Sequence, residues 1–429
     1  MRKYNQLLKL SLIYTSLMIF CFVSEGFANY VYVVNSTDST LSVIDTATNS
    51  VFATITLPPN SSDQDVAITP NGDFAYVTNY TNNTVSVIDT ATQIITTTIS
   101  SDLNGPFGVA FTPNGDTAYI CNNGTNTATI VDTGTNATTG VLTIGTWPVG
   151  VAITPNGNFV YIANNLDGTV SVIETSNNTV LTTISVGASP FGVAITPNGN
   201  SVYVTNLNDG TVSVISTLTN TVIATIPIGS NPRLLAITPD GTKVYVANQN
   251  SQNVSVIDTL SNTVTTIIPI RDGSAGPFGV AILPNGNSVY VSDNSLNQIY
   301  VIDTMTNTIT NTIPVGNAPQ GLAITPDPLP PPSPILPPTF LTGFQAKNRF
   351  LTQTDIINTI SWSPPISGNI PVSYLVYRNN SSTPIAKISA ASLLTYFDHN
   401  CKKNTVYTYD VVSVSANGSL SAAASVIIR

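Results

Sequence analysis

The chain has 429 residues, and only 8% of them are charged, with 22 acidic and 13 basic side chains and a formal net charge of −9. Globular proteins usually carry about 25% charged residues. In this chain Thr, Asn and Ser take their place beside many Val and Ile, a mixture that favours strands and tight turns over helices. The chain is also too apolar to be disordered, so we expect a folded all-β protein.

The first 28 residues have the organisation of an export signal. The basic stretch MRKYNQLLK precedes an apolar run from Leu10 to Val23, and the pattern GFA provides a cleavage site before Asn29. The alternative is an uncleaved membrane anchor, but the run is short against the roughly 20 residues that span a bilayer. We therefore predict a signal peptide over 1–28 and a mature chain, not transmembrane, that is periplasmic, secreted or on the cell surface.

From residue 29 onward the sequence repeats itself with a period of 42 to 45 residues. The tyrosine of a YVTN-like phrase marks each copy, at Tyr32, Tyr76, Tyr119, Tyr161, Tyr203, Tyr245 and Tyr290. Within one copy, four apolar segments separated by turn residues run over 191–197, 201–206, 211–217 and 221–229. Four strands in a period of this length match one blade of a β-propeller.

The phase of the repeat predicts how the ring closes. The mature chain begins with a second strand, NYVYVVN at 29–35, and the array ends with a first strand, GLAITPD at 321–327. Together these two fragments complete one blade. The sequence therefore predicts a seven-bladed β-propeller, with four antiparallel strands per blade, over 29–327.

The phrases YVTN, TVSVIDT and GVAITPNG resemble those of the YVTN-repeat β-propeller family, which also occurs in surface-layer-like proteins. The resemblance covers about residues 29–327. It indicates the fold but not the function, because propellers host many unrelated activities. Residues 328–338 form a proline-rich linker, and 339–429 resemble a fibronectin type III domain. That second resemblance implies a β-sandwich with Trp362 as a buried aromatic and Tyr407 at a tyrosine corner.

Charge divides the two domains and bears on the partners. Residues 29–328 hold eighteen acidic and three basic side chains, whereas the chain from 329 onward holds seven basic and three acidic. Phosphate binding depends on clustered Lys and Arg, so we expect no nucleic-acid partner.

The mature chain lacks the sequence patterns of cofactor and metal sites. It has no Cys-x-x-Cys-His, no paired His and no phosphate-binding loop, and its one histidine, His399, is expected on a surface loop of the smaller domain. Cys121 and Cys401 fall in different domains, which argues against a disulfide framework. We therefore predict no cofactor, no metal site and no catalytic residues.

A carboxylate ends the third strand of six repeats, and six carboxylates in a ring could suggest calcium. We expect instead that each caps the turn into the fourth strand by accepting backbone N–H groups. The residues at this position are Asp45, Asp89, Asp132, Glu174, Ser216, Asp258 and Asp303.

Binding residues are sought where the copies disagree, in the loops before each first strand. In an up-and-down blade these loops share one face of the ring with the second-to-third loops, around the mouth of the central channel. The predicted ligand-binding residues are Asp63, Asp65, Phe107, Trp147, Phe191, Arg233, Phe278 and Gln320, and a longer loop adds Arg271 and Asp272. Aromatic and amide side chains suit a glycan or a protein loop. The alternative is that the Phe rings pack on one another and plug the channel.

Three hypotheses of function follow. The first is an exported, non-catalytic binding or adhesion protein whose propeller face recognises a protein or a glycan. The second is a lactonase- or lyase-like propeller enzyme that uses carboxylates and a divalent ion at the mouth, where Asp63 and Asp65 offer few of the six to eight oxygens of a calcium site. The third is a self-assembling surface-layer or matrix component. The oligomeric state is left open.

Overall fold

The computed structural model describes residues 29–270, 276–327, 337–350, 353–365, 371–379, 381–399, 401–414 and 420–429. The predicted signal peptide, the loop with Arg271 and Asp272, and most of the predicted linker lie outside these ranges. The chain divides between Pro328 and Leu329 into two compact units, and each is described by itself. Across the described ranges, no helix is long and apolar enough to cross a membrane.

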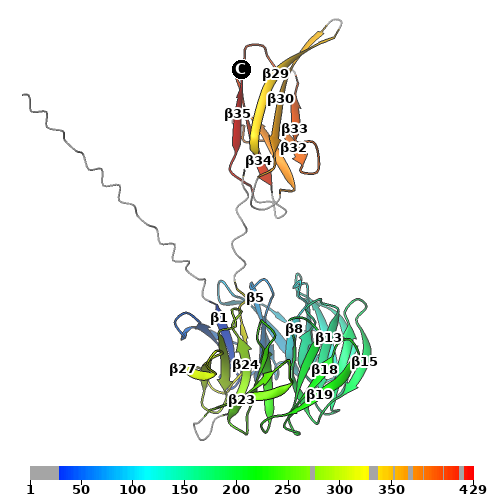
Figure 1. Ribbon diagram of the computed structural model, residues 1–429, viewed down its shortest axis with the longest axis vertical. Helices are drawn as coiled ribbons and strands as arrows, with labels where there is room; N and C mark the ends of the chain where they lie inside the picture. Colours follow the sequence, from blue (N-terminus) through cyan, green and yellow to red (C-terminus); the bar gives the residue numbers. More distant parts are fainter. Residues whose placement is uncertain are drawn as a thin grey trace, which may run out of the picture. The chain divides into compact units, whose positions relative to one another are not determined.

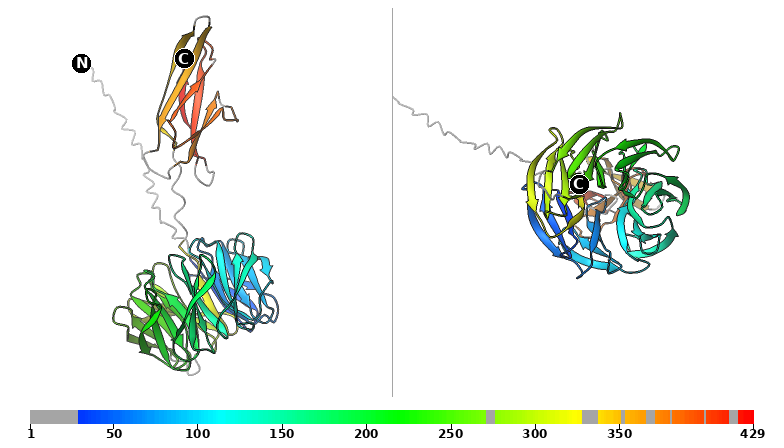
Figure 2. Two further views of the ribbon diagram at one scale, coloured as in Figure 1. Left: turned by 90° about the vertical axis from the view of Figure 1, so that its right-hand side faces the viewer. Right: turned by 90° about the horizontal axis from the view of Figure 1, so that it is seen from below.

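The first unit consists of seven four-stranded antiparallel sheets, the blades, arranged in a ring (Figures 1 and 2). Blade 1 contains β28 (Pro319–Ile324), β1 (Tyr30–Asn35), β2 (Thr40–Asp45) and β3 (Ser50–Thr56). Blade 2 contains β4 (Asp63–Ile68), β5 (Phe74–Asn79), β6 (Thr84–Asp89) and β7 (Ile94–Ile99). Blade 3 contains β8 (Pro106–Phe111), β9 (Thr117–Asn122), β10 (Thr127–Asp132) and β11 (Ala137–Thr143). Blade 4 contains β12 (Pro148–Ile153), β13 (Phe159–Asn164), β14 (Thr169–Glu174) and β15 (Thr179–Ser185).

Blade 5 contains β16 (Pro190–Ile195), β17 (Ser201–Asn206), β18 (Thr211–Ser216) and β19 (Thr221–Pro227). Blade 6 contains β20 (Pro232–Ile237), β21 (Lys243–Asn248), β22 (Asn253–Asp258) and β23 (Thr263–Pro269). Blade 7 contains β24 (Pro277–Ile282), β25 (Ser288–Asp293), β26 (Gln298–Asp303) and β27 (Thr308–Pro314). The predicted all-β fold and seven-bladed architecture are thus confirmed.

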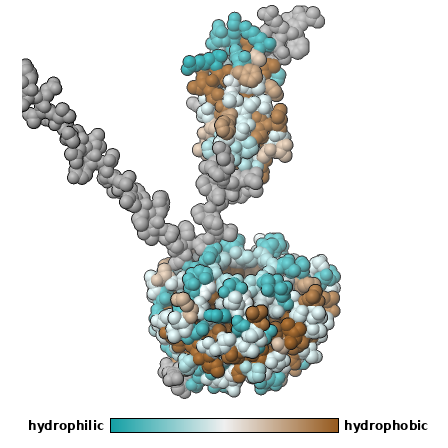
Figure 3. Space-filling view, in the orientation of Figure 1, coloured by the Kyte–Doolittle hydropathy of each residue, from teal (hydrophilic) through white to brown (hydrophobic). Residues whose placement is uncertain are grey.

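Burial explains why each strand has its composition. In every blade the second and third strands are buried on both faces, because their side chains pack alternately against the two neighbouring blades. Tyr32 and Val34 of β1 pack toward blade 2, whereas Val31 and Val33 pack toward blade 7. The fourth strands form the outer side of the ring and expose much of their length. Apolar residues gather in places on this outer side (Figure 3).

The ring closes where the phase of the repeat predicted. Strand β28 pairs antiparallel with β1, with Tyr32 opposite Ala323 and Val33 opposite Leu322. The seven first strands β4, β8, β12, β16, β20, β24 and β28 contact one another in order, and β28 returns to β4. These strands surround the axis of the propeller, so the residues at their starts determine what lies at the mouth.

Each repeat tyrosine holds the next blade in place. The Tyr of the second strand donates its hydroxyl hydrogen to a side chain in the turn between the third and fourth strands of the following blade. The acceptors, in ring order from blade 1 to blade 7, are Gln93, Asn136, Asn178, Asn220, Asn262, Asn307 and Asn49. All seven acceptors have positive φ, which Asn tolerates better than most residues. The repeated YVTN tyrosine is therefore an inter-blade connector.

The second unit is a β-sandwich. One sheet contains β29 (Thr339–Phe350), β30 (Gln353–Ser363) and β33 (Thr395–Asp398), and the other contains β32 (Ala386–Ser389), β31 (Ser373–Arg378), β34 (Tyr407–Val414) and β35 (Ala424–Ile428). Trp362 is 5% exposed and packs edge-on against Tyr374 between the sheets.

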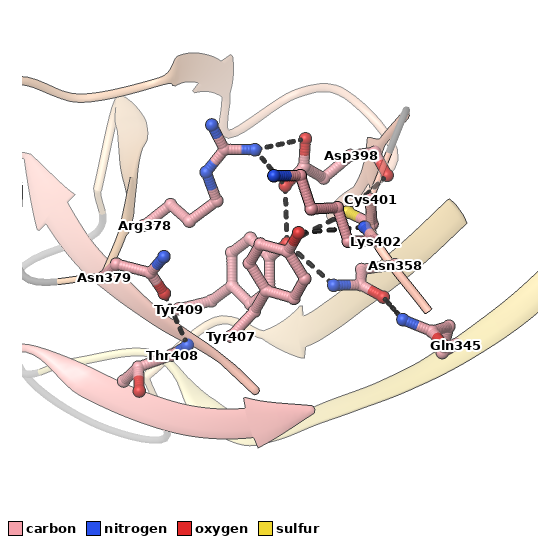
Figure 4. A network of polar contacts seen from close by, with 10 residues as sticks. All are labelled: Gln345, Asn358, Arg378, Asn379, Asp398, Cys401, Lys402, Tyr407, Thr408 and Tyr409. Atoms are coloured by element: carbon pink, nitrogen blue, oxygen red, sulfur yellow. Dashed lines mark hydrogen bonds and ion pairs between the residues drawn. The ribbon is translucent and has the colours of Figure 1, made fainter. Parts of the chain in front are cut away.

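A polar network lies inside this sandwich (Figure 4). The hydroxyl of Tyr407 accepts a hydrogen bond from the Lys402 backbone N–H at 2.9 Å, as a tyrosine corner would. Arg378 pairs with Asp398 at 2.9 Å, and the Tyr409 hydroxyl donates to the same carboxylate. These contacts give Trp362, Tyr374, Tyr407 and Tyr409 structural roles.

Candidate functional site: the propeller mouth

A β-bulge at the start of every first strand builds the mouth. In β8, Pro106 is opposite Asn122 but Val109 is opposite Ile120, so β8 holds one extra residue. The same shift occurs in all seven first strands. Bulges redirect side chains out of the regular pleat. The second residue of each first strand forms what we call the mouth ring, which in order around the axis is Gln320, Gln64, Phe107, Val149, Phe191, Arg233 and Phe278.

The mouth ring and the neighbouring loops line a cavity of about 360 Å³. Its lining residues are Gln64, Phe107, Trp147, Val149, Asn165, Phe191, Leu207, Arg233, Phe278 and Gln320. This volume suits a small molecule or the end of a larger ligand. The structure therefore brings six of the eight predicted site residues into one pocket.

The three phenylalanines form a continuous edge-to-face stack. The ring centroids of Phe107 and Phe191 lie 5.6 Å apart, and those of Phe191 and Phe278 lie 5.8 Å apart. Phe191 and Phe278 are each only 6% exposed, whereas Phe107 is half-buried. The rings therefore pack on one another, as one of the two predicted alternatives expected, and they also line the pocket.

Arg233 lies over two of these rings, where they meet. Its guanidinium carbon is 5.1 Å from the centroid of Phe191 and 5.1 Å from that of Phe278, close enough for cation–π attraction to both. Nε donates to Gln249 Oε1 at 2.8 Å. Among the described residues, no ion pair or hydrogen bond engages the two terminal nitrogens. Burial lowers the pKa of Arg233, as expected for a cation held partly away from water.

Trp147 occupies the loop position just before β12 and is 43% exposed. Its φ is +56°, a conformation that bulky residues rarely adopt, and the corresponding positions of other blades hold Ser62, Gly105, Ser189, Asn231 and Ala318, also at positive φ. Hydrogen bonds fix the backbone here, from Trp147 N to Asn126 Oδ1 and from Asn165 N to Trp147 O, both at 2.9 Å. The chain thus holds a large ring at the mouth in a strained conformation.

Glycine forms the layer below the mouth ring because the first strands come very close there. A Cβ on Gly150 would lie 2.1 Å from the Phe191 carbonyl oxygen, and one on Gly279 would lie 2.3 Å from that of Gln320. Two blades depart from glycine at this layer and carry Asp65 and Leu234 instead.

Hydroxyl groups on three second strands fasten this layer together. The Thr205 hydroxyl accepts from the bulge N–H of Gly192 at 2.8 Å and donates to the Arg233 carbonyl at 2.7 Å. Thr78 and Ser292 make the equivalent bonds. Each hydroxyl therefore fixes the backbone of the mouth-ring residue of the following blade, including Arg233.

Asp63 and Asp65 belong to the same bulge as Gln64 but do not line the cavity. Asp63 is fully buried. Turning the Asn79 side-chain amide over, so that its oxygen and nitrogen exchange places, satisfies both of its ends, and its nitrogen then donates to Asp63 Oδ1 at 2.8 Å. Burial raises the pKa of Asp63 to about 6. Asp65 keeps some contact with solvent, but the protein surrounds it near the axis and this desolvation raises its pKa to about 7.

Five of the six carboxylates at the ends of the third strands cap the following turn by accepting backbone N–H groups, whereas Glu174 accepts from the side-chain amide of Asn177 at 3.0 Å. Asp89 Oδ1 accepts from Thr92 N at 2.7 Å, and Asp303 Oδ1 accepts from Thr306 N at 2.7 Å. In the part of the chain that the structure describes, no group of three His, Cys, Asp or Glu side chains could hold a metal ion. The structural interpretation of this Asp ring is thus the one that fits its contacts.

A family model described as Lactonase, 7-bladed beta-propeller matches residues 20–144 and 152–264, more than half of the chain. The chain belongs to this family. No curated protein matches the chain.

Several solved structures share the fold of this lactonase-family chain. A functionally unknown protein from Desulfotomaculum acetoxidans DSM 771 is 22% identical with a TM-score of 0.61, covering 70% of this chain and 99% of its own. Kuenenia stuttgartiensis hydrazine synthase is 21% identical with a TM-score of 0.57, covering 62% of this chain and 90% of its own. The dihydro-heme d1 dehydrogenase NirN, in complex with DHE, is 12% identical with a TM-score of 0.54, covering 69% and 75%.

Sequence reasoning on this lactonase-family propeller missed several pocket residues. Asn165 and Leu207 directly follow the Asn that ends a second strand, and Gln249, which binds Arg233, holds the same position in blade 6. These loops share the mouth face with the loops before the first strands. The residue after each YVTN-like phrase was therefore the signal that could have found them.

Proposed function

We propose that this chain is an exported, non-catalytic recognition protein whose propeller mouth binds a glycan. The observation that carries the proposal is the pocket itself. Its lining combines a phenylalanine stack, an exposed tryptophan, the amides of Gln64, Asn165 and Gln320, and one guanidinium. Aromatic faces and amides together bind sugars, which present apolar C–H faces and hydroxyl groups at once.

The arrangement of the pocket favours binding over reaction. Its walls are held in advance by ring stacking, by the Thr205 bridge and by the hydrogen bonds around Trp147. A preformed site loses little conformational entropy when a ligand binds. The titratable carboxylates Asp63 and Asp65 lie outside the lining.

Thermal unfolding of residues 29–429 against a panel of neutral and acidic oligosaccharides tests the proposal. A ligand that binds only the folded state raises the midpoint by mass action. We expect an oligosaccharide to raise the midpoint in the presence of EDTA, and Trp147→Asn to abolish that shift. A panel that gives no shift, or a shift that Trp147→Asn leaves intact, argues against a glycan site at the mouth.

The second candidate is a lactonase- or lyase-like enzyme, which the family membership and the raised pKa values of Asp63 and Asp65 favour. Asp65 would act as a general base, with a rate that rises as pH passes about 7. Lactone hydrolysis measured from pH 5 to 9, with and without calcium, distinguishes this candidate. Turnover above the buffer rate that Asp65→Asn removes would replace the recognition proposal.

The remaining parts of the chain fit an exported protein. The N-terminal segment has the sequence features of a signal peptide. The two-sheet sandwich of the second unit and the bond from Lys402 N to the Tyr407 hydroxyl support its assignment as a fibronectin type III-like domain. Such a domain would serve as a spacer or a docking module. The outer strands expose apolar residues such as Phe52, Leu181 and Ile267, which could pack against a second copy of the chain. Sedimentation velocity would detect the oligomers that such self-assembly produces.

A further inference from the structure

We infer that the mouth pocket selects its ligand by a single carboxylate, which the terminal nitrogens of Arg233 bind, and that the ligand is an acidic sugar. The inference rests on the proposed glycan-binding function and names the chemical class of the ligand. It is drawn from the position of Arg233 among the pocket residues.

The first step is the orientation of Arg233. The guanidinium lies over the adjacent rings of Phe191 and Phe278, at 5.1 Å from each centroid, and Gln249 accepts the hydrogen bond from Nε. The side of the guanidinium that carries the two terminal nitrogens has no partner among the described residues, and Arg233 lines the cavity. A planar guanidinium with two parallel donors matches the two oxygens of a carboxylate.

The second step is the energetic need for an anion. Arg233 is half-buried, and this desolvation lowers its pKa. Its described surroundings at the mouth provide aromatic rings and amides but no carboxylate within ion-pair distance. A ligand carboxylate would supply the missing charge partner at a half-buried guanidinium, where water screens charge less than on an open surface.

The third step is the limit that the rest of the propeller sets on ligand charge. Residues 29–328 hold eighteen acidic and three basic side chains. Of the two basic residues that the structure describes there, Lys243 lies at the opposite end of its blade and donates to the Thr304 carbonyl. One guanidinium in an acidic protein favours a ligand with one negative charge, because a polyanion would meet repulsion from the surrounding surface.

The fourth step is the sugar. Trp147 exposes its ring at the edge of the pocket that contains Arg233, and Gln64, Asn165 and Gln320 supply amide donors and acceptors. A uronic acid joins a carboxylate to a ring with hydroxyl groups and a C–H face, so it can use all three kinds of lining residue. A peptide carboxylate could pair with Arg233, and its backbone with the amides, but it has no hydroxylated ring with a C–H face to place against Trp147.

Calorimetric titration of residues 29–429 with three probes tests the inference. The probes are a glucuronate-terminated trisaccharide, the methyl ester of the same trisaccharide, and a glutamate-terminated tripeptide. We expect the acid to bind at least tenfold more tightly than its ester, and the tripeptide to bind more weakly than the acid. Because the ester comparison changes the ligand alone, it stands even if an Arg233 variant fails to fold.

Variants locate the preference. Arg233→Gln should reduce the acid-over-ester ratio to about one, Arg233→Lys should leave an intermediate ratio because it keeps the charge without the planar fork, and Lys243→Gln is the matched control that should leave the ratio unchanged. Circular dichroism and the unfolding midpoint confirm that each variant is folded.

The outcomes separate this inference from the proposed function. Equal binding of acid and ester that Trp147→Asn abolishes would overturn the carboxylate anchor and leave the glycan site standing. Arg233-dependent binding of the tripeptide without the trisaccharide would overturn the sugar. If none of the three probes binds, the inference is overturned, and the wider oligosaccharide panel decides the proposed function separately.

Discussion

The hydroxyl of Tyr290 in blade 7 donates a hydrogen bond of 2.6 Å to Asn49 Oδ1 in blade 1, across the closing seam between the last blade and the first. Tyr290 is 1% exposed, and burial raises its pKa to about 12, so the phenol stays protonated and remains a donor. The same contact joins Tyr203 to Asn262 at an internal seam. The closing seam therefore uses the same bond as the seams made by consecutive blades.

This equivalence predicts how the seams respond to losing one oxygen atom. Tyr290→Phe removes the donor and leaves Asn49 Oδ1 without it, which should cost about 1–2 kcal/mol of unfolding free energy. Tyr203→Phe is the matched control at an internal seam and should cost about the same. Urea unfolding of both variants measures the difference. A cost at Tyr203 with none at Tyr290 would mean that the closing seam is not formed as described.

Closure also depends on the single strand β28, which pairs with β1. Deleting residues 319–328 exposes the edge of β1, and an unpaired strand edge invites association with other chains. We expect the deleted protein to form oligomers by light scattering and to unfold at a lower temperature. A deletion of 329–338, which spares β28, is the control. A 319–328 deletion that stays monomeric with an unchanged midpoint would contradict the closure.

The buried carboxylates predict an unusual pH dependence of stability. Burial raises the pKa of Asp65 to about 7, above its value in the unfolded chain, so the folded state binds a proton that the unfolded state has lost. Stability contributed in this way is present below about pH 4 and is lost as pH rises to about 7.

Asp65→Asn should remove that loss. We expect a higher unfolding midpoint than the parent at pH 8 and little difference at pH 4.5, with a gain on the order of a few kcal/mol at the upper end. Asp116→Asn, in an exposed turn, is the control. A gain of equal size at both pH values would show that the carboxylate is not the cause.

Replacing Trp147 should change stability and ligand binding in opposite directions. Its positive φ costs a bulky residue about 1–2 kcal/mol, and Asn, which blade 6 carries at this position as Asn231, adopts the conformation more readily. Trp147→Asn should therefore raise the unfolding free energy by about 1 kcal/mol and abolish ligand binding. A variant that loses stability would show that the ring is held for packing and not for recognition.

The fold could be predicted from the sequence because its period is visible in it, but the contacts between repeats could not. Tyr203 marks the period, yet its partner Asn262 lies 59 positions away in the next copy. A periodic sequence cannot distinguish a contact within a repeat from the equivalent contact between repeats. The hydrogen-bonding role of the tyrosines was missed for that reason.

The site shows the same limit. Departures from the repeat identified Phe191, Arg233 and Phe278. They did not show that the guanidinium lies over both rings, because that contact depends on the order of the blades around the axis. Asp63 and Asp65 stood out equally, yet the bulge directs Gln64 to the pocket and places both carboxylates elsewhere. Sequence spacing alone does not say on which side of a bulge a residue emerges.

The central claim is that the mouth is a binding site, and Trp147 allows a direct measurement of it. The chain has two tryptophans, and the other, Trp362, is buried in the second unit. In a Trp362→Phe variant the fluorescence reports on the mouth alone. We predict a saturable change in Trp147 emission with any oligosaccharide that raises the unfolding midpoint. An oligosaccharide that binds by calorimetry but leaves the Trp147 emission unchanged would show that the site lies elsewhere.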